Sequence, residues 1–246
     1  DALLKKALAM GIDYVATGHY AKIEKGEDGK YILRASEAVK KDQSYVLYNF
    51  TQEQLAHTLM PLGGYNKDWV RQKAEELGLG VAHKPDSQEI CFVEDDDYAK
   101  FITDYSGYKP KEGDILDVNG NVIGKHRGLI YYTIGQRKGI GAYGRPMFVM
   151  KIDAENNTIT LGEKGMEFSN ELTAYDVNFV SGEFPKENML ITAKVRYQAP
   201  PAEAMLCPQK DGTVKLMFPE PQRAVTPGQA AVFYDGEYVL GGGTIE

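Results

Sequence analysis

Pairs of turn-forming residues between short apolar runs place the strongest limit on how this chain can fold. In its second half, four such pairs each separate two apolar segments: Asn119-Gly120, Asn156-Asn157, Asp211-Gly212 and Asp235-Gly236. Asn, Asp and Gly tolerate the left-handed backbone that a tight hairpin loop requires. The residues after about Gly107 are therefore predicted to form mainly antiparallel β-hairpins.

The residues before this point alternate helical and strand patterns, which is typical of an α/β fold. An opening helix is predicted to end at Gly11, a favoured left-handed cap. Residues 12–17 are nearly all apolar, as in a parallel strand buried on both faces. A hairpin is predicted around Asp28-Gly29.

Four more helices are expected from capping residues and apolar periodicity. The first runs from Asp42 to about Leu59, and the second begins at Asn66 and is ended by Gly78. Two short helices are predicted to open at Ser87 and within the acidic run 94–97.

The change of pattern near Gly107 predicts more than one domain in 246 residues. The length of the β-rich half and the Pro200-Pro201 pair suggest that it is divided again. We expect domains at residues 1–107, 108–165 and 166–246, the second small and the third a β-barrel.

Composition excludes several classes of protein. No apolar stretch approaches the roughly 20 residues that span a bilayer. The two cysteines, Cys91 and Cys207, are too few for a disulfide framework and lack the spacing of a zinc site. A reducing, cytoplasmic location is therefore expected. Because Asp1 stands inside a helical pattern, we also expect the chain to be part of a longer protein.

Charge is unevenly distributed. The net charge is −7, yet residues 118–152, here called the basic segment, contain no Asp or Glu. Its cations are Lys125, Arg127, Arg137, Lys138, Arg145 and Lys151, with His126 and three tyrosines between them. Cations and aromatic rings together suit contact with RNA. A solvated loop is the alternative.

Two polar segments could bind a nucleotide or phosphate. Ala16-Thr17-Gly18-His19-Tyr20 follows a predicted strand, where glycine lets a ligand approach the backbone. Residues 40–45, Lys-Lys-Asp-Gln-Ser-Tyr, stand at a predicted helix start, which attracts anions. Taken alone, each segment is explained more simply, as a glycine turn or as an ordinary helix cap.

A third segment, Ser87-Gln88-Glu89-Ile90-Cys91-Phe92, carries a lone thiol between a polar turn and an apolar run. A buried, inert cysteine is the common case. A reactive thiol would need a nearby cation or helix end to lower its pKa. The residues alone leave both interpretations open.

In this order, these segments and Gly135-Gln136-Arg137-Lys138-Gly139 resemble the tRNA-specific 2-thiouridylase family. The resemblance continues through Val195-Arg196-Tyr197, Thr226-Pro227-Gly228-Gln229 and Leu240-Gly241-Gly242-Gly243, and so covers essentially the whole chain. It implies an α/β remainder of a PP-loop domain, then a small central β-rich tRNA-binding domain and a C-terminal β-barrel.

The implied activity is that of a tRNA-uridine 2-sulfurtransferase, which replaces O2 of the wobble uridine, position 34, with sulfur. In the family, ATP adenylates the uridine oxygen and a cysteine persulfide supplies the sulfur. Cys91 matches the persulfide cysteine, and Gly18 matches a glycine that contacts ATP. The positions matching tRNA contacts are His19, Lys41, Asp42, Gln43, Arg196, Tyr197 and Gln229.

The resemblance also implies which partners and cofactors to expect. Mg²⁺ is expected with ATP, and no permanent cofactor or metal site is expected. The partners are tRNA and a sulfur donor, either a cysteine desulfurase or a sulfur-relay protein, without a membrane.

Two family motifs are missing from these residues. They are a pyrophosphate-binding Ser-Gly-Gly-x-Asp-Ser loop and an Asn-Pro-Cys segment whose cysteine forms a transient disulfide. The chain alone is therefore expected to be inactive. A tRNA-binding module without chemistry and an RNA-independent, rhodanese-like sulfur carrier are the alternatives.

Overall fold

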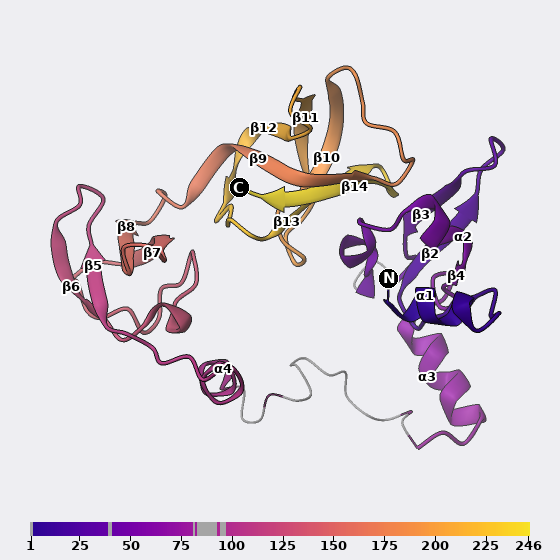
Figure 1. Ribbon diagram of the computed structural model, residues 1–246, viewed down its shortest axis with the longest axis horizontal. Helices are drawn as coiled ribbons and strands as arrows, with labels where there is room; N and C mark the ends of the chain where they lie inside the picture. Colours follow the sequence, from indigo (N-terminus) through magenta and orange to yellow (C-terminus); the bar gives the residue numbers. More distant parts are fainter. Residues whose placement is uncertain (1, 39–40, 81, 83–92, 94–96) are drawn as a thin grey trace. The chain divides into compact units, whose positions relative to one another are not determined.

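Figure 1 shows the computed structural model of the chain, which describes all residues except 1, 39–40, 81, 83–92 and 94–96. The chain forms two compact units. Unit 1 combines Asp1–Lys84 with Asn170–Glu246, and unit 2 is Pro85–Ser169. The boundaries predicted at 107/108 and 165/166 stay predictions.

Unit 1 begins with helix α1 (Ala2–Ala9) and strand β1 (Val15–Ala16). Gly11 has the positive φ of +76° expected of a cap. Strand β1 pairs in parallel with β4 (Thr58–Leu59), as predicted. The expected burial on both faces is wrong, because Ile12 is 46% and Tyr14 55% exposed. Within the described residues, β1 has one neighbouring strand and only two paired residues.

The predicted hairpin is confirmed as β2 (Ala21–Lys25) and β3 (Tyr31–Ala35), antiparallel in register. Its turn is closed by the Asp28 carboxylate, which accepts a hydrogen bond from the Lys30 amide at 3.0 Å. Gly29 supplies a φ of +82° there.

The helix predicted from Asp42 to Leu59 is wrong. A 3₁₀-helix, η2 (Ser44–Leu47), is followed by α2 (Gln52–Ala56) and then by β4. Thr51 begins α2 through a capping box with Gln54, and this new start interrupts the apolar periodicity.

Two predicted helices are confirmed. Helix α3 (Lys67–Glu76) is capped by Asn66, and Gly78 has a φ of +65° just after it. In unit 2, Asp97 caps α4 (Tyr98–Ser106). The helix predicted at Ser87 lies outside the described residues.

Unit 2 contains a four-stranded sheet in the order β6-β5-β8-β7. The strands are β5 (Gly113–Leu116), β6 (Val122–His126), β7 (Met147–Asp153) and β8 (Thr158–Glu163), with a 3₁₀-helix η4 at Leu129–Tyr131. Strands β5 and β8 pair in parallel. The turn-forming residue pairs predict only antiparallel neighbours, so this pairing was not expected. Ile115, Val149, Ile159 and Leu161 form the centre of its core.

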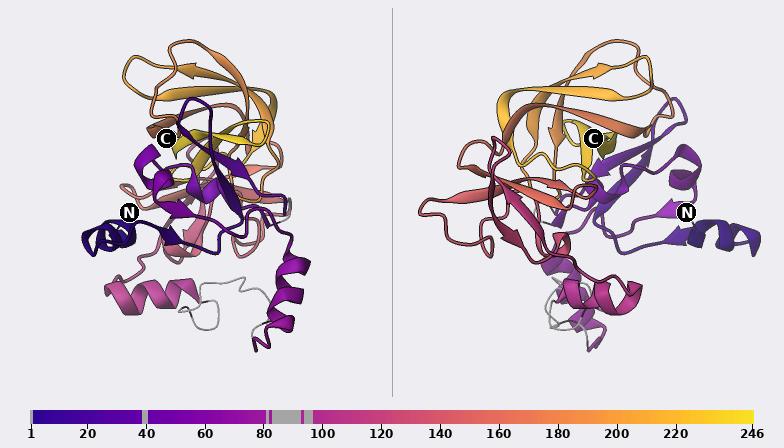
Figure 2. Two further views of the ribbon diagram at one scale, coloured as in Figure 1. Left: turned by 90° about the vertical axis from the view of Figure 1, so that its right-hand side faces the viewer. Right: turned by 60° about the vertical axis from the view of Figure 1, so that its left-hand side comes forward.

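Six antiparallel strands of unit 1 close into a barrel, seen in orange to yellow in Figures 1 and 2. They are β9 (Phe168–Phe179), β10 (Met189–Lys194), β11 (Ala202–Pro208), β12 (Val214–Arg223), β13 (Ala230–Asp235) and β14 (Tyr238–Ile245). Pairing of β13 with β14 completes the ring. The Pro200-Pro201 pair lies between the neighbouring barrel strands β10 and β11, so its use as a sign of a division between domains is wrong.

All four turn pairs connect consecutive antiparallel strands, as the sequence predicts. The barrel core is lined by side chains such as Leu206, Leu216 and Phe233, all fully buried.

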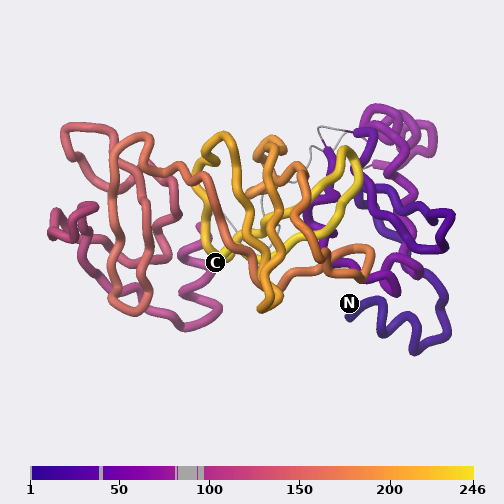
Figure 3. The backbone as a smooth tube through the Cα atoms, turned by 90° about the horizontal axis from the view of Figure 1, so that it is seen from above, coloured from indigo at the N-terminus to yellow at the C-terminus, as the bar shows by residue number. Residues whose placement is uncertain are grey.

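The β2–β3 hairpin joins the barrel as an extension of its sheet. Arg34 on β3 pairs with Tyr238 on β14, and the Ala35 amide donates to the Glu237 carbonyl at 2.8 Å. Figure 3 shows the yellow β13–β14 turn beside this hairpin. A second core, which includes Leu33, Leu55 and Val232, packs the α/β residues of unit 1 against the outside of the barrel.

Candidate functional site

The segment after β3 is held in shape by the Asp42 carboxylate. Its Oδ1 accepts hydrogen bonds from the amides of Ser36, at 2.9 Å, and Ser44, at 3.3 Å. Its Oδ2 accepts one from the Ser44 hydroxyl at 2.7 Å. These bonds fix the backbone on which Lys41 and Gln43 stand. Lys40 lies outside the described residues.

Tyr197, just after β10, contacts this segment from the barrel. Its hydroxyl donates to the Asp42 carbonyl at 3.1 Å. Its ring meets Tyr45 edge-on, with 5.8 Å between centroids. Burial, and then Asp42, raise the pKa of Tyr197, so the hydroxyl is a neutral donor. Residues 155 positions apart are thus joined.

Gln43 ties the segment to the loop after β1. Its side-chain carbonyl accepts the Tyr20 amide at 3.0 Å, and its own amide donates to the Tyr20 carbonyl at 2.9 Å. His19, next to Tyr20, contacts the Thr17 hydroxyl through Nδ1 at 3.0 Å. Gly18 is exposed, and a Cβ placed there would meet only Leu62 Cδ1, at 3.8 Å. The protein's own packing therefore gives no reason for glycine at this position, whereas a close ligand would.

Arg196 organises the turn that leads to Gln229. Its guanidinium donates to the Ala224 carbonyl through Nη2, at 2.6 Å, and Nε, at 3.1 Å, and to the Thr226 hydroxyl at 3.2 Å. The Thr226 carbonyl in turn accepts the Gln229 amide at 3.1 Å. Burial, followed by repulsion from Arg223, lowers the pKa of Arg196.

Hydrogen bonds between chain segments thus bring the predicted tRNA-binding positions of unit 1, or their immediate chain neighbours, together. These contacts run from the loop at His19 through Gln43 and Asp42 to Tyr197, the neighbour of Arg196, and on to the Gln229 turn. We call this set of residues the junction surface. Three further residues pack against this surface: Tyr45, which belongs to the segment 40–45 noted in the sequence, and Lys194 and Tyr234, which the sequence did not single out.

These residues stand among the predicted positions. Tyr45 donates to the Ala230 carbonyl at 2.7 Å. Burial raises the pKa of Tyr234, with a further contribution from Asp42. The available signal for Lys194 was its place two residues before Arg196 in the sequence.

Cys91 and its whole segment 87–92 lie outside the described residues, so its role as the persulfide cysteine stays a prediction. Cys207 lies on β11 of the barrel, partly buried, with its Sγ 4.0 Å from the Met205 carbonyl. Among the residues that the structure describes, no cluster of His, Cys, Asp or Glu is arranged to hold a metal ion.

The basic segment lies in unit 2, and half of its cations are paired with acids just outside it. The pairs are Lys125 with Asp114 at 2.6 Å, Arg145 with Glu163 at 2.6 Å, and Lys151 with Asp153 at 3.3 Å. His126 is 1% exposed. Its Nδ1 accepts the Gly128 amide, so its Nε2 donates to the Asn157 carbonyl. It is therefore a structural histidine.

The other cations remain available to a ligand. Arg137 and Lys138 are exposed and form no ion pair with any described residue. Gln136 holds their loop through bonds to the Thr133 amide and the Lys138 carbonyl. Arg127 lies 4.1 Å over the Tyr131 ring. A cation stacked on an aromatic ring and two further cations on a fixed loop suit an RNA backbone.

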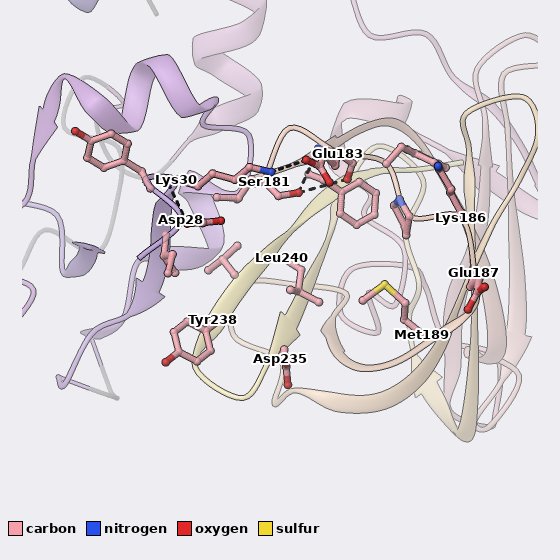
Figure 4. Close-up of a pocket in the computed structure, with 17 residues that line it drawn as sticks. Asp28, Lys30, Ser181, Glu183, Lys186, Glu187, Met189, Asp235, Tyr238 and Leu240 are labelled. Atoms are coloured by element: carbon pink, nitrogen blue, oxygen red, sulfur yellow. Dashed lines mark hydrogen bonds and ion pairs between the residues drawn. The ribbon is translucent and has the colours of Figure 1, made fainter. Parts of the chain in front are cut away.

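A cavity of about 790 Å³ opens elsewhere in unit 1, between the β2–β3 hairpin and the barrel (Figure 4). Apolar side chains such as Phe179 and Leu240 line it, and Lys30 and Glu183 form an ion pair at 2.5 Å on its edge. None of the predicted site residues lines it. Its acids, which include Asp28, Glu187 and Asp235, disfavour an RNA backbone.

No helix among the described residues is both long and apolar enough to cross a membrane.

Three protein-family models match successive parts of the chain. The tRNA methyl transferase HUP domain matches residues 1–95 and the tRNA methyl transferase PRC-barrel domain matches residues 99–163. The aminomethyltransferase beta-barrel domain matches residues 169–245. The predicted fold class, an α/β remainder of a PP-loop domain followed by two β-rich domains, is confirmed by these matches and by the closed barrel.

Similar curated proteins cover the whole chain. The tRNA-specific 2-thiouridylase MnmA of Acetivibrio thermocellus is 56% identical, and that of Clostridioides difficile is 54% identical. Both alignments span 100% of this chain and 69% of the relative's length. Identity at this level, with matching domains in the same order, shows that the chain belongs to the tRNA-specific 2-thiouridylase family, whose members are tRNA-uridine 2-sulfurtransferases.

Proposed function

We propose that this chain serves the ATP-dependent transfer of persulfide sulfur to C2 of the wobble uridine, position 34, of tRNA. The product is 2-thiouridine. The relatives named as tRNA-specific 2-thiouridylases support the reaction class. The observation that carries the proposal for these residues is the junction surface, where positions predicted to touch tRNA, from segments far apart in the chain, connect with one another.

The residues of the junction surface would hold the RNA rather than react with it. Arg196 and Lys41 supply positive charge for phosphates, while Tyr197 offers a ring and Gln43 an amide. Asp42 contributes by fixing the backbone of its neighbours. His19 and Gln229 would extend the contact at the two ends of the surface.

Gly18 fits the proposed approach of ATP, because it is exposed after β1 and no packing contact occupies the place of its missing side chain. ATP, with Mg²⁺, would supply the adenylyl group that turns uridine O2 into a leaving group. The pyrophosphate-binding Ser-Gly-Gly-x-Asp-Ser loop is not among these 246 residues. We therefore expect these residues alone to be inactive in thiolation.

Cys91 is proposed to carry the sulfur as a persulfide. Thiolates accept and release sulfur by exchange, as in thiol–disulfide reactions. The sulfur would come from a cysteine desulfurase or a relay protein. We also propose that the domains meet at residues 107/108 and 165/166 and that the protein is cytoplasmic.

The first prediction concerns which cysteine is loaded. After incubation with a cysteine desulfurase and cysteine, mass spectrometry of peptides should find an added sulfur on Cys91 and not on Cys207. The Cys91→Ser variant should lose the label, while the matched Cys207→Ser variant should keep it. Equal loading of Cys91→Ser and the parent chain would refute the assignment.

The same samples separate the alternatives when tRNA binding is measured beside loading. Binding together with loading agrees with the proposed sulfur transfer. Binding without loading indicates a tRNA-binding module without chemistry. Loading without binding indicates a sulfur carrier that acts independently of RNA.

A further inference from the structure

Lys194 stands at the end of β10 between two tyrosine rings. Its Nζ lies 5.8 Å from the ring centroid of Tyr45 and 5.9 Å from that of Tyr197. These are the same two rings that pack edge-on at the centre of the junction surface. The ammonium is therefore held close to two aromatic rings, whose electron-rich faces attract a cation.

The alternation of β10 places this lysine on the outside of the barrel. Ala193 and Val195 are 1% and 2% exposed and belong to the barrel core. Lys194, the last residue of β10, is only partly buried and so faces outward; Arg196 is also partly buried and lies two residues beyond the end of the strand. The lysine thus faces outward within two residues of the arginine that is predicted to contact tRNA.

The charge of Lys194 is not neutralised by any described residue. It forms no ion pair with a carboxylate in the part of the chain that the structure describes. Asp42 is the acid whose field acts on it, but the Asp42 carboxylate already accepts three hydrogen bonds from Ser36 and Ser44. Burial lowers the pKa of Lys194, and the charge of Asp42 offsets only part of that effect.

We infer that Lys194 binds a phosphate of the tRNA backbone beside Arg196 and Tyr197, and so is a further tRNA-contacting residue of the junction surface. The inference rests on the proposed function. A phosphate would give the ammonium the direct ion pair that it does not form with any described residue, and the two rings would hold it toward the RNA. Arg196 uses its Nε and Nη2 on Ala224 and Thr226, so only its remaining N–H groups can serve the RNA beside Lys194.

The test is the salt dependence of tRNA binding by the 246-residue chain. Each phosphate that the protein no longer neutralises reduces the slope of log affinity against log salt by about 0.7–0.9. Lys194→Met keeps an unbranched apolar stem against the rings and removes the charge. At low salt, the variant should bind tRNA more weakly than the parent chain. The ratio of parent affinity to variant affinity should shrink about threefold between roughly 50 and 200 mM salt. Lys194→Arg should retain the slope of the parent.

Lys215→Met is the matched control, because Lys215 is also on the barrel but is paired with Glu171 at 2.8 Å. It should leave both slope and affinity unchanged. The inference is overturned if Lys194→Met has the same slope as the parent chain. This includes the case in which the variant loses the same factor of tRNA affinity at every salt concentration, which would indicate only a packing role. If the parent chain does not bind tRNA, both the proposed function and this inference are wrong. If the parent binds tRNA and the variant has an unaltered slope, only this inference is wrong.

Discussion

Asp42 illustrates what a single residue shows in sequence and what it does not. The sequence places it at the start of a helix and, by family resemblance, against tRNA. The structure shows its carboxylate occupied by Ser36 and Ser44 and its carbonyl by Tyr197. The helix expected to begin at Asp42 is instead a short 3₁₀-helix that begins at Ser44, and the contact with tRNA stays a prediction. The partners of Asp42 could not be predicted, because one of them lies 155 residues away and no local pattern encodes that pairing.

Tyr45 provides a prediction about stability at alkaline pH. Burial is the main reason that its pKa rises from 10.0 to about 12. A raised pKa contributes stability that is fully present below pH 10, where folded and unfolded chains both hold the proton. Between pH 10 and about 12, the Tyr45 hydroxyl ionises in the unfolded chain but not in the folded one. The free energy of unfolding therefore falls there by up to about 1.4 kcal/mol per pH unit.

The Tyr45→Phe variant isolates this contribution. At pH 8 it should be less stable by about 1 kcal/mol, because the bond to the Ala230 carbonyl is lost. The difference should narrow and then reverse as pH rises from 10 to 12. Urea unfolding at pH 8, 10 and 11 measures it. A difference that stays constant with pH would contradict the burial of the hydroxyl.

At the scale of elements, hairpins were predictable and longer-range pairings were not. Asn119-Gly120 and Asp211-Gly212 each specify a turn whose two strands must be neighbours. Strands β5 and β8 pair in parallel although β6 and β7 lie between them in the chain. No turn motif connects the two strands directly, so the sequence does not predict their pairing. The pattern of residues 42–59 predicts one helix because its apolar spacing continues across the Thr51 cap, where the chain starts a new helix.

The loop of Arg137 and Lys138 gives a prediction for an element of unit 2. We expect this loop to touch the tRNA backbone, because both cations are exposed and form no ion pair with described residues. In the double variant Arg137→Ala/Lys138→Ala, the slope of log affinity against log salt should flatten by about 0.7–0.9 for each phosphate that the loop no longer binds. Filter binding across a salt series measures the slope.

Arg145→Ala is the control for that loop. Its guanidinium is paired with Glu163, so its removal should change the slope little. If the double variant keeps the parent's slope and affinity, RNA does not touch this loop and the basic segment is a solvated surface.

At the scale of the whole molecule, the order of domains was predictable from motifs, since each motif belongs to one part of the family's fold. The assembly of unit 1 was not. It depends on the Arg34–Tyr238 pairing and on the core around Leu33 and Val232, which bring together residues from the two ends of the chain. This assembly is what joins the Lys41–Gln43 segment to Arg196 and Tyr197.

The central claim is that these 246 residues hold tRNA for 2-thiolation while lacking the parts that activate uridine. The most direct measurement compares the chain with the same chain extended at its N-terminus to include the Ser-Gly-Gly-x-Asp-Ser loop and the Asn-Pro-Cys segment. Each is incubated with substrate tRNA, ATP and Mg²⁺, and with a cysteine desulfurase and cysteine to supply persulfide sulfur. The RNA is then digested and 2-thiouridine is quantified, with tRNA binding measured in parallel. Both chains should bind tRNA, and only the extended one should yield 2-thiouridine, because backbone donors for the pyrophosphate are otherwise missing. Product from the 246 residues at a rate comparable to the extended chain would contradict the account.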